Sequence, residues 1–528
     1  MTPNEAKGRY RNFVERDFRE HQEDMVEFAN GTHKKYTVVE APPGIGKSLV
    51  GACLGAMSGK AVYLVHSKSL QLQLAHDFPE IPIMWGRDNY TCLANPELTA
   101  DMCMHSKMHP CENKINKTCP YHKAKEIALA APVAVLNYHY FMTEANYVGR
   151  FSGRELIIVD EADSLESVLD GFVGITLAEH QLRQFKIHIP KFKNAKAKEA
   201  VEGWKDWADR AIMKLDKIYR EVSSEVEHLE FINSELQAGQ VKLQKRVGGL
   251  LMKLKMFVEY VDDSWVYERF EDEDKGRLTV SFSPTWLPKK MADEFFWRHA
   301  DRFVLMSGTF PFLPVLAREV ALEEGQIAYK AYPSIFPAKS RQIENMGVCN
   351  ISYKTKDVEL KKGLDKVEEI MSKPEHLNEK GLIHTVSYAF AREVMRMGDR
   401  RLITHQNGQD RQEVLDRFKA SREPLVLVSP SFERGISLDD DLCRFIIWLK
   451  APFLSLNDKR VAARLYGSGR MGQLWYRASM LLAVVQGCGR GMRNAEDRCK
   501  SYLLDEQIGM AIGESPRMVP GWFREALW

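Results

Sequence analysis

Short apolar runs alternate with helix-like segments through the first part of the chain. The runs at 36–40 (YTVVE), 61–67 (AVYLVHS), 133–137 (VAVLN) and 156–163 (LIIVDEAD) are rich in β-branched residues and predict buried strands. The first two are followed by LVGACLGAM and SLQLQLAHDF, which have helical spacing. Strands that alternate with helices predict a parallel, doubly wound α/β sheet.

Two segments interrupt this pattern before it resumes at 303–310 (FVLMSGTF) and again from 380 onward. Residues 86–130 are rich in Cys, Lys, His, Asn and Pro and show no period, whereas residues 170–275 lack strong strand signals and place apolar residues at helical spacing. We therefore divide the chain into a first α/β lobe (1–85, 131–169 and 276–322), a cysteine-rich insertion (86–130), a helical insertion (170–275) and a second α/β lobe (323–528).

Composition narrows the classes of partner. The 528 residues exceed what one core holds, and 45% hydrophobic with 28% charged residues is typical of a soluble globular protein. Because the net charge is only +2, any polyanion must be met by a local basic groove. The N-terminus lacks the apolar region of a secretory signal, and no apolar run approaches the ~20 residues that span a bilayer. We expect no membrane partner and an intracellular location, in cytoplasm or nucleoid, or in host cytoplasm for a viral protein.

Residues 41–48 (APPGIGKS) lie between a predicted strand and a predicted helix, as a phosphate-binding loop requires. The nucleotide-binding loop comprises Pro43, Gly44, Ile45 and Gly46, and the two glycines would let backbone N–H groups approach the phosphates. Lys47 would contact the β- and γ-phosphates, and Ser48 would ligate Mg²⁺. A chance glycine-rich turn is the alternative, and the flanking strand and helix disfavour it.

A carboxylate pair, Asp160 and Glu161, ends the run at 156–163. Beside a phosphate loop, Asp160 would hold Mg²⁺ and Glu161 would orient and deprotonate the attacking water. An acidic turn without function is the alternative.

Near the C-terminus, residues 486–493 read QGCGRGMR. Arg490 and Arg493 would share a helix face and reach a γ-phosphate, where guanidinium groups stabilise developing charge. A solvated basic helix face is the alternative, but the flanking glycines indicate close approach of another backbone.

Four cysteines gather in the cysteine-rich insertion: Cys92, Cys103, Cys111 and Cys119. None forms the tight Cys-x₂-Cys pair typical of zinc sites, so four spaced thiolates favour an iron–sulfur cluster over zinc, with free thiols as a third alternative. Such a cluster would fix a segment too small for its own core.

Contacts to a nucleic-acid strand need cations for phosphates and aromatic faces for bases. The candidates are Tyr138 and His139 after the run at 133–137, and Lys191 and Lys193 in the helical insertion. Core packing is the alternative for the aromatic residues, and a solvated face is the alternative for the lysines.

These motifs, in this order, resemble the superfamily 2 DNA helicases of the XPD/DinG type, which carry an iron–sulfur cluster. Residues 41–48 look like motif I, 160–163 like motif II, 307–309 (SGT) like motif III, 380–388 like motif IV, 429–438 like motif V and 486–493 like motif VI. The resemblance implies that Arg19 and Gln22 read adenine, that Gly435 binds nucleotide and that Gln486 acts in catalysis. Two places differ: Asp163 replaces the usual His of motif II, and Arg434 and Ser437 depart from motif V.

The resemblance implies two RecA-like (P-loop) lobes with ATP and Mg²⁺ between them, an inserted [4Fe–4S] domain and an inserted α-helical arch. It further implies a monomer that moves 5′ to 3′ on single-stranded DNA and unwinds forked or flapped duplex, with RNA–DNA hybrid as an open alternative substrate. Two rival functions remain: a translocase that remodels protein–DNA complexes without efficient unwinding, and a metal-stabilised ATP-clamp adaptor.

Overall fold

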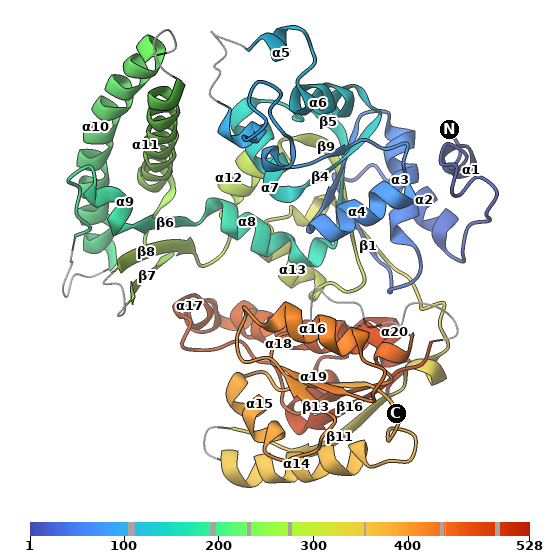
Figure 1. Ribbon diagram of the computed structural model, residues 1–528. Coiled ribbons are helices and arrows are strands. Elements are labelled where there is room, and N and C mark those ends of the chain that lie inside the picture. Colours follow the sequence, from blue (N-terminus) through green and yellow to red (C-terminus); the bar gives the residue numbers. More distant parts are fainter. Residues whose placement is uncertain are drawn as a thin grey trace.

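The computed structural model describes residues 1–103, 111–190, 197–229, 234–272, 277–352, 355–432, 438, 440–491 and 497–528. Two α/β lobes lie one above the other, and a helical arch stands beside the first lobe (Figure 1). Among the described helices, none combines the length and apolarity needed to cross a bilayer.

Lobe 1 is built on a seven-stranded sheet in which every pairing is parallel. Parallel strands are buried on both faces, which explains the uninterrupted apolar runs of the sequence. The strands, in spatial order, are β10 (Ile327–Ala331), β1 (Tyr36–Glu40), β9 (Ala300–Ser307), β5 (Arg154–Asp160), β2 (Ala61–Val65), β4 (Val133–Asn137) and β3 (Ile83–Met84). The helices are α1 (Pro3–Lys7), α2 (Gln22–Gly31), α3 (Lys47–Ser58), α4 (Lys68–Asp77), α7 (Tyr138–Thr143), α8 (Leu165–Val173), α12 (Lys289–Ala292) and α13 (Leu313–Glu319).

Lobe 2 repeats this design with a six-stranded parallel sheet. Its strands, in spatial order, are β11 (Ile343–Cys349), β16 (Lys500–Asp505), β15 (Phe445–Trp448), β12 (Gly381–His384), β14 (Val426–Ser429) and β13 (Leu402–Thr404). Its helices are α14 (Lys356–Met371), α15 (Tyr388–Met395), α16 (Arg411–Ala420), α17 (Lys459–Gly467), α18 (Gly469–Cys488), α19 (Glu506–Glu514) and α20 (Gly521–Arg524).

The arch consists of two long helices, α10 (Ala197–Leu229) and α11 (Ser234–Tyr260), together with the short helix α9 (Glu179–Arg183). The helical prediction for residues 170–275 is confirmed for these helices but is wrong for the base of the arch. There, a three-stranded antiparallel sheet forms in the order β6 (Ile175–Ala178), β8 (Arg277–Pro284), β7 (Trp265–Asp272). Trp204 of α10 packs against Phe282 of β8, with 5.1 Å between ring centroids, so the helices are anchored on this sheet.

Two predicted boundaries of lobe 1 are wrong. Strand β10 pairs in parallel with β1, so lobe 1 extends past residue 322. Strand β8 belongs to the sheet of the arch, so lobe 1 does not resume at residue 276.

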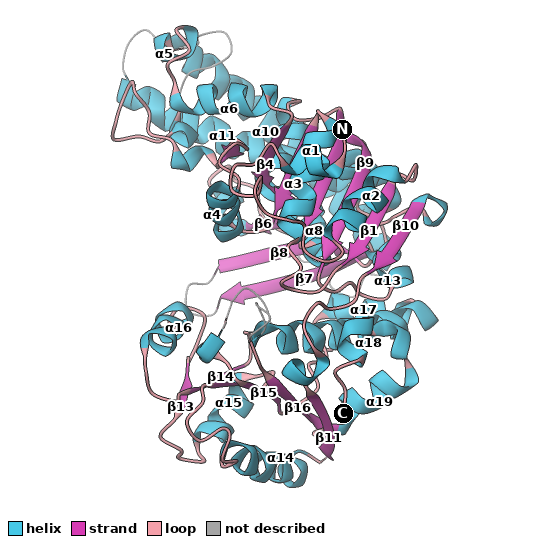
Figure 2. Ribbon diagram, turned by 90° about the vertical axis from the view of Figure 1, so that its right-hand side faces the viewer, coloured by secondary structure: helices cyan, strands magenta, loops and turns pink. Residues whose placement is uncertain are grey.

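The cysteine-rich insertion contains α5 (Glu112–Ile115) and α6 (Pro120–Ala130) and lies at the far end of lobe 1 from lobe 2 (Figure 2).

Candidate active site

The phosphate loop connects β1 to α3 at the edge of the lobe 1 sheet where the parallel strands end. Gly44 and Gly46 adopt φ values of 82° and 86°, a region that favours glycine, and Gly46 is the N-cap of α3. The loop therefore presents the N-terminus of a helix to its ligand, which is a favourable place for phosphate. The Lys47 ammonium donates to the Ala41 and Pro42 carbonyls, at 2.9 and 3.4 Å.

Arg19, which lies just before α2, and Gln22, the first residue of α2, hydrogen-bond to carbonyl groups of this loop. The Arg19 guanidinium donates to the Gly44 carbonyl at 2.6 Å, and the Gln22 amide donates to the Ile45 and Gly46 carbonyls at 2.9 and 3.1 Å. A Cβ at position 46 would lie 2.2 Å from that amide nitrogen and would strain a backbone with φ 86°, so a larger residue would displace Gln22 from the loop. Arg19 and Gln22 thus order the loop, and their contact to adenine stays a prediction.

Asp160 ends β5, which is separated from β1 only by β9. Its carboxylate is buried and accepts hydrogen bonds from the Tyr63 hydroxyl at 2.8 Å and the Glu161 backbone N–H at 3.0 Å. The Tyr63 hydroxyl also interacts with Ser48. The two predicted Mg²⁺ ligands, Ser48 and Asp160, are therefore neighbours joined through one hydroxyl. Burial raises the pKa of Asp160, and the nearby positive charge of Lys47 opposes that rise.

Glu161 lies in the cleft between the lobes with a left-handed backbone (φ 49°). Loss of hydration and the charges of Asp160 and Asp163 raise its pKa to about 7, while Arg490 and Lys47 are near enough to lower it. Glu161 therefore lies within electrostatic range of Lys47 of its own lobe and of Arg490 of lobe 2. Arg493 and Gly435 lie outside the described residues.

Asp163 bridges the lobes. It accepts a hydrogen bond from the Ser307 hydroxyl at 2.5 Å and another from the Gln486 amide at 2.6 Å. Gln486 lies in the last turn of α18, two residues before the helix ends. The residue that departs from the usual motif II thus joins three motifs of the sequence.

A second contact between the lobes lies nearby. The Trp522 indole N–H of α20 donates to the Gly308 carbonyl at 3.1 Å, and a Cβ at Gly489 would lie 3.7 Å from the Pro43 ring. That separation is ordinary contact, whereas a Cβ at Gly491 would lie 2.4 Å from Cys499 Sγ and 3.0 Å from the Cys443 carbonyl, so close packing within lobe 2 accounts for this glycine beside Arg490.

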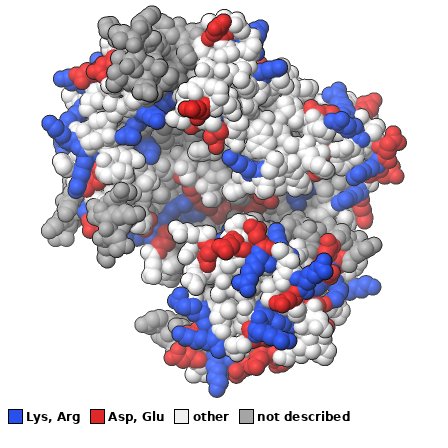
Figure 3. Space-filling view, in the orientation of Figure 1, with Lys and Arg blue, Asp and Glu red and all other residues white. Residues whose placement is uncertain are grey.

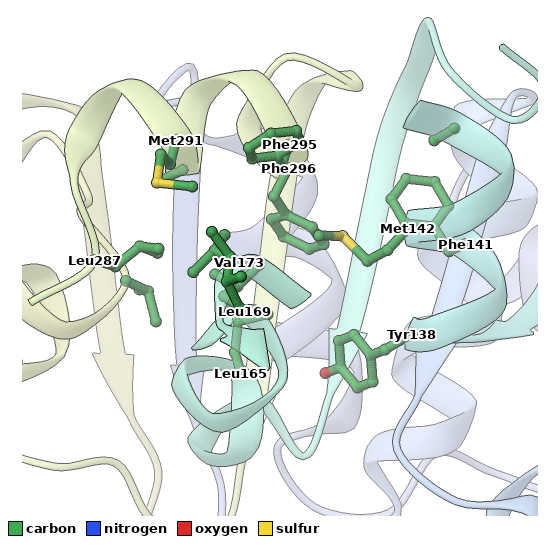
Figure 4. Packing of buried hydrophobic residues seen from close by; sticks show 14 of the residues in the cluster. Tyr138, Phe141, Met142, Leu165, Leu169, Val173, Leu287, Met291, Phe295 and Phe296 are labelled. Carbon is green, nitrogen blue, oxygen red and sulfur yellow. The ribbon is translucent and has the colours of Figure 1, made fainter. Parts of the chain in front are cut away.

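Tyr138 corrects a sequence prediction. Its side chain is 3% exposed and packs in the lobe 1 core near Leu165, Leu169 and Phe296 (Figure 4), and its hydroxyl donates to the Asp160 carbonyl at 2.9 Å. A ring in this position cannot stack on a base, and it supports the acidic motif instead. His139, the next residue, is exposed.

Lys191 and Lys193 lie outside the described residues. On the face shown in Figure 3, other Lys and Arg side chains gather on the arch, and acidic side chains occupy part of the crevice between the lobes.

The four clustered cysteines are half-buried thiols outside any disulfide. Cys111 and Cys119 are the N-caps of α5 and α6, and Cys103 follows a short 3₁₀ turn. As chemistry, four thiols in one loop-rich segment fit an iron–sulfur cluster. As geometry, the described residues contain no group of three or more His, Cys, Asp or Glu side chains placed to hold a metal ion, so the ligand set is not assembled there.

Comparison with known proteins agrees with this architecture. Residues 370–526 match the family described as a helicase C-terminal domain, and residues 91–182 match the family described as DEAD_2. A solved XPD helicase covers 97% of this chain and 100% of its own, with a TM-score of 0.62 at 16% identity. The Xpd4 structure from S. tokodaii likewise covers 97% and 100%, with a TM-score of 0.57 at 14% identity.

A curated relative is the ATP-dependent DNA helicase CHL1 of Saccharomyces cerevisiae (strain YJM789). It is 33% identical over 95 residues, 15% of this chain, and the chain spans 11% of that relative's length.

The two RecA-like lobes match the fold of the solved XPD helicase, with a phosphate loop in the first lobe and Arg490 of the second lobe within electrostatic range of Glu161. Residues 370–526 and 91–182 thus carry two family domains, a helicase C-terminal domain and DEAD_2, on a fold similar to that of solved XPD helicases.

Proposed function

We propose that this protein is an ATP-dependent DNA helicase that moves 5′ to 3′ along single-stranded DNA and unwinds forked or flapped duplex as a monomer. The observation that supports the proposal is that Lys47 of lobe 1 and Arg490 of lobe 2 both act electrostatically on Glu161, which places charges of both lobes near one carboxylate. A nucleotide bound there touches both lobes, so hydrolysis changes how they are held together.

The residues divide the chemistry among themselves. Backbone N–H groups of the phosphate loop and Lys47 bind the phosphates, and Ser48 and Asp160 hold Mg²⁺. Glu161 accepts a proton from the attacking water, and Arg490 stabilises negative charge on the transferred phosphoryl group. Asp163 reports the state of the site to Gln486 of lobe 2.

The deciding experiment is Lys47→Ala, with Lys60→Ala as the matched control because Lys60 is an exposed lysine of the same lobe. We expect single-strand-stimulated ATP hydrolysis to fall at least about a hundredfold in Lys47→Ala, the scale of losing one electrostatic contact to a transition state. Equal turnover in both variants would refute the proposal.

Strand separation needs its own measurement. Duplexes with a 5′ overhang, a 3′ overhang, a fork or a flap distinguish direction and substrate, and an RNA–DNA hybrid tests the alternative substrate. Stimulated hydrolysis with no unwinding of any of these would favour the rival translocase, and ATP binding without stimulation would favour the clamp adaptor.

We further propose that Cys92, Cys103, Cys111 and Cys119 bind a [4Fe–4S] cluster, which would fix the cysteine-rich insertion. The support is the chemistry of four half-buried thiols outside any disulfide in one segment. An anaerobic preparation should be brown and contain iron, and Cys111→Ser should lose both, whereas Cys53→Ala, a buried cysteine elsewhere, should retain both. A colourless protein that contains zinc would refute the cluster.

A further inference from the structure

Helix α17 of lobe 2 contacts the base of the arch. The Arg460 guanidinium donates through Nε to the Pro284 carbonyl at 2.9 Å, and that of Arg464 donates to the Thr285 carbonyl at 2.8 Å. Lys459 reaches the Tyr267 carbonyl at 3.4 Å. The three basic side chains of α17, at positions 459, 460 and 464, thus hydrogen-bond to backbone carbonyls of β7, of β8 and of the segment that follows β8.

The same two arginines also bind lobe 1. Arg460 and Arg464 contact the Glu166 carboxylate of α8 at 3.3 and 2.7 Å, and Arg460 also pairs with Asp170. Both pairs of residues are four apart on their helices, so each presents its charges on one face. We call Arg460, Arg464, Glu166 and Asp170 the interlobe clasp.

The clasp is largely closed to water. Arg464 is 2% exposed and lies between two indole rings, 4.3 Å from the Trp286 centroid and 4.5 Å from that of Trp475. Burial raises the pKa of Asp170 to about 7 and raises that of Glu319, which faces the same arginine, well above its ordinary range. Buried ion pairs add little net stability but penalise the loss of one partner, so they fix geometry.

Both helices of the clasp, α8 and α17, are close in sequence to residues of the nucleotide site or to the helix that carries them. Helix α8 begins two residues after Asp163, and α17 is followed directly by α18, which carries Gln486. The turn between α17 and α18 is held by the Trp286 indole N–H, which donates to the Ser468 hydroxyl at 2.7 Å. Gln486 and the arginines of α17 therefore lie on one continuous helical stretch of lobe 2.

We infer that Arg460 and Arg464 are positioning residues that transmit movement of lobe 2 at the nucleotide site to the arch. The inference rests on the proposed ATP-driven function and adds a regulated part to it. When the nucleotide shifts lobe 2, α17 moves along α8 within the clasp and carries the base of the arch with it, so the arch takes a position set by the nucleotide.

The test follows the distance between the arch and lobe 1 by fluorescence energy transfer. Non-natural fluorescent side chains replace Met213 of α10 (75% exposed) and Leu72 of α4 (61% exposed), so the native cysteines stay untouched. Energy transfer is compared with ADP and with ADP–beryllium fluoride. We expect a nucleotide-dependent shift in the parent protein and in Arg470→Ala, an exposed arginine of α18, and no shift in Arg460→Gln or Arg464→Gln.

A second readout separates coupling from chemistry. In the arginine variants, duplex unwound per ATP hydrolysed should fall about tenfold, the scale of a broken interaction between coupled sites, while ATP hydrolysis without DNA is retained. If a glutamine variant fails to fold, Arg460→Lys replaces it in both measurements, because it keeps the charge for Asp170 but lacks the Nε–H that donates to the Pro284 carbonyl.

Two results would overturn the inference: a shift that persists in the clasp variants, or no shift in a parent protein that hydrolyses ATP. A parent protein that does not hydrolyse ATP would refute the proposed function itself, so the two failures are distinct.

Discussion

The bridge through Asp163 gives the sharpest test of how the two lobes communicate. The contact that crosses from lobe 2 to lobe 1 is the hydrogen bond that the Gln486 amide donates to the Asp163 carboxylate at 2.6 Å. A hydrogen bond to a charged group contributes about 1.5–3 kcal/mol, which corresponds to roughly ten- to 150-fold in a rate or an equilibrium. We therefore expect Asp163→Ala to reduce stimulation of ATP hydrolysis by single-stranded DNA within that range.

A double-mutant cycle isolates the contact itself. Asp163→Ala, Gln486→Ala and the double variant are compared by turnover at saturating ATP, with and without a single-stranded oligonucleotide. Because each substitution alone already removes the contact, the double variant should lose little more stimulation than either single one. The Ser307 hydroxyl, which donates to Asp163 at 2.5 Å, contributes equally in both backgrounds of the cycle. Strictly additive losses would show that the contact transmits nothing.

Three further outcomes follow from the geometry. Because the pKa of Glu161 is raised to about 7 and only its ionised form accepts a proton, kcat/KM for ATP should rise with pH through about 7, and Glu161→Gln should abolish this rise. Gly487→Ala should lower the free energy of unfolding by about 1–3 kcal/mol in denaturant titrations, since its Cβ would lie 2.4 Å from the Trp448 ring. Tyr138→Phe should cost about 1 kcal/mol of stability by losing the bond to the Asp160 carbonyl, yet leave single-strand affinity in fluorescence anisotropy unchanged.

Much of the fold could be predicted because parallel strands buried on both faces appear as unbroken apolar runs. Strands β1 and β4 coincide with the predicted runs at 36–40 and 133–137. The base of the arch was missed because β7 carries charged residues such as Arg269 and Glu271 within a short run. Strand β10 was missed because IAYKA lies half-exposed at the edge of its sheet, where burial leaves little trace in the sequence.

The site shows a similar division. The phosphate loop and Asp160-Glu161 are contiguous motifs, so their chemistry could be recognised along the chain. The partners of Asp163, Ser307 and Gln486, are 144 and 323 residues away along the chain, and no local sequence pattern predicts such contacts. Tyr63 was overlooked for another reason: a tyrosine within an apolar strand looks like ordinary core, and only its hydroxyl reveals a link to Asp160. Tyr138 misled in the opposite direction, because an aromatic residue after a strand fits either a core or a stacking platform.

The carbonyl contacts of Lys47 have a consequence for how ligand enters. With its ammonium resting on Ala41 and Pro42 oxygens, the lysine already has acceptors before any nucleotide arrives. When a triphosphate binds, the Lys47 ammonium exchanges the two carbonyl oxygens for phosphate oxygens, so its charge keeps hydrogen-bond acceptors throughout binding. The loop therefore discriminates among nucleotides. A ligand without a terminal phosphate gives the Lys47 ammonium weaker acceptors than the Ala41 and Pro42 carbonyls, so the lysine stays on the backbone.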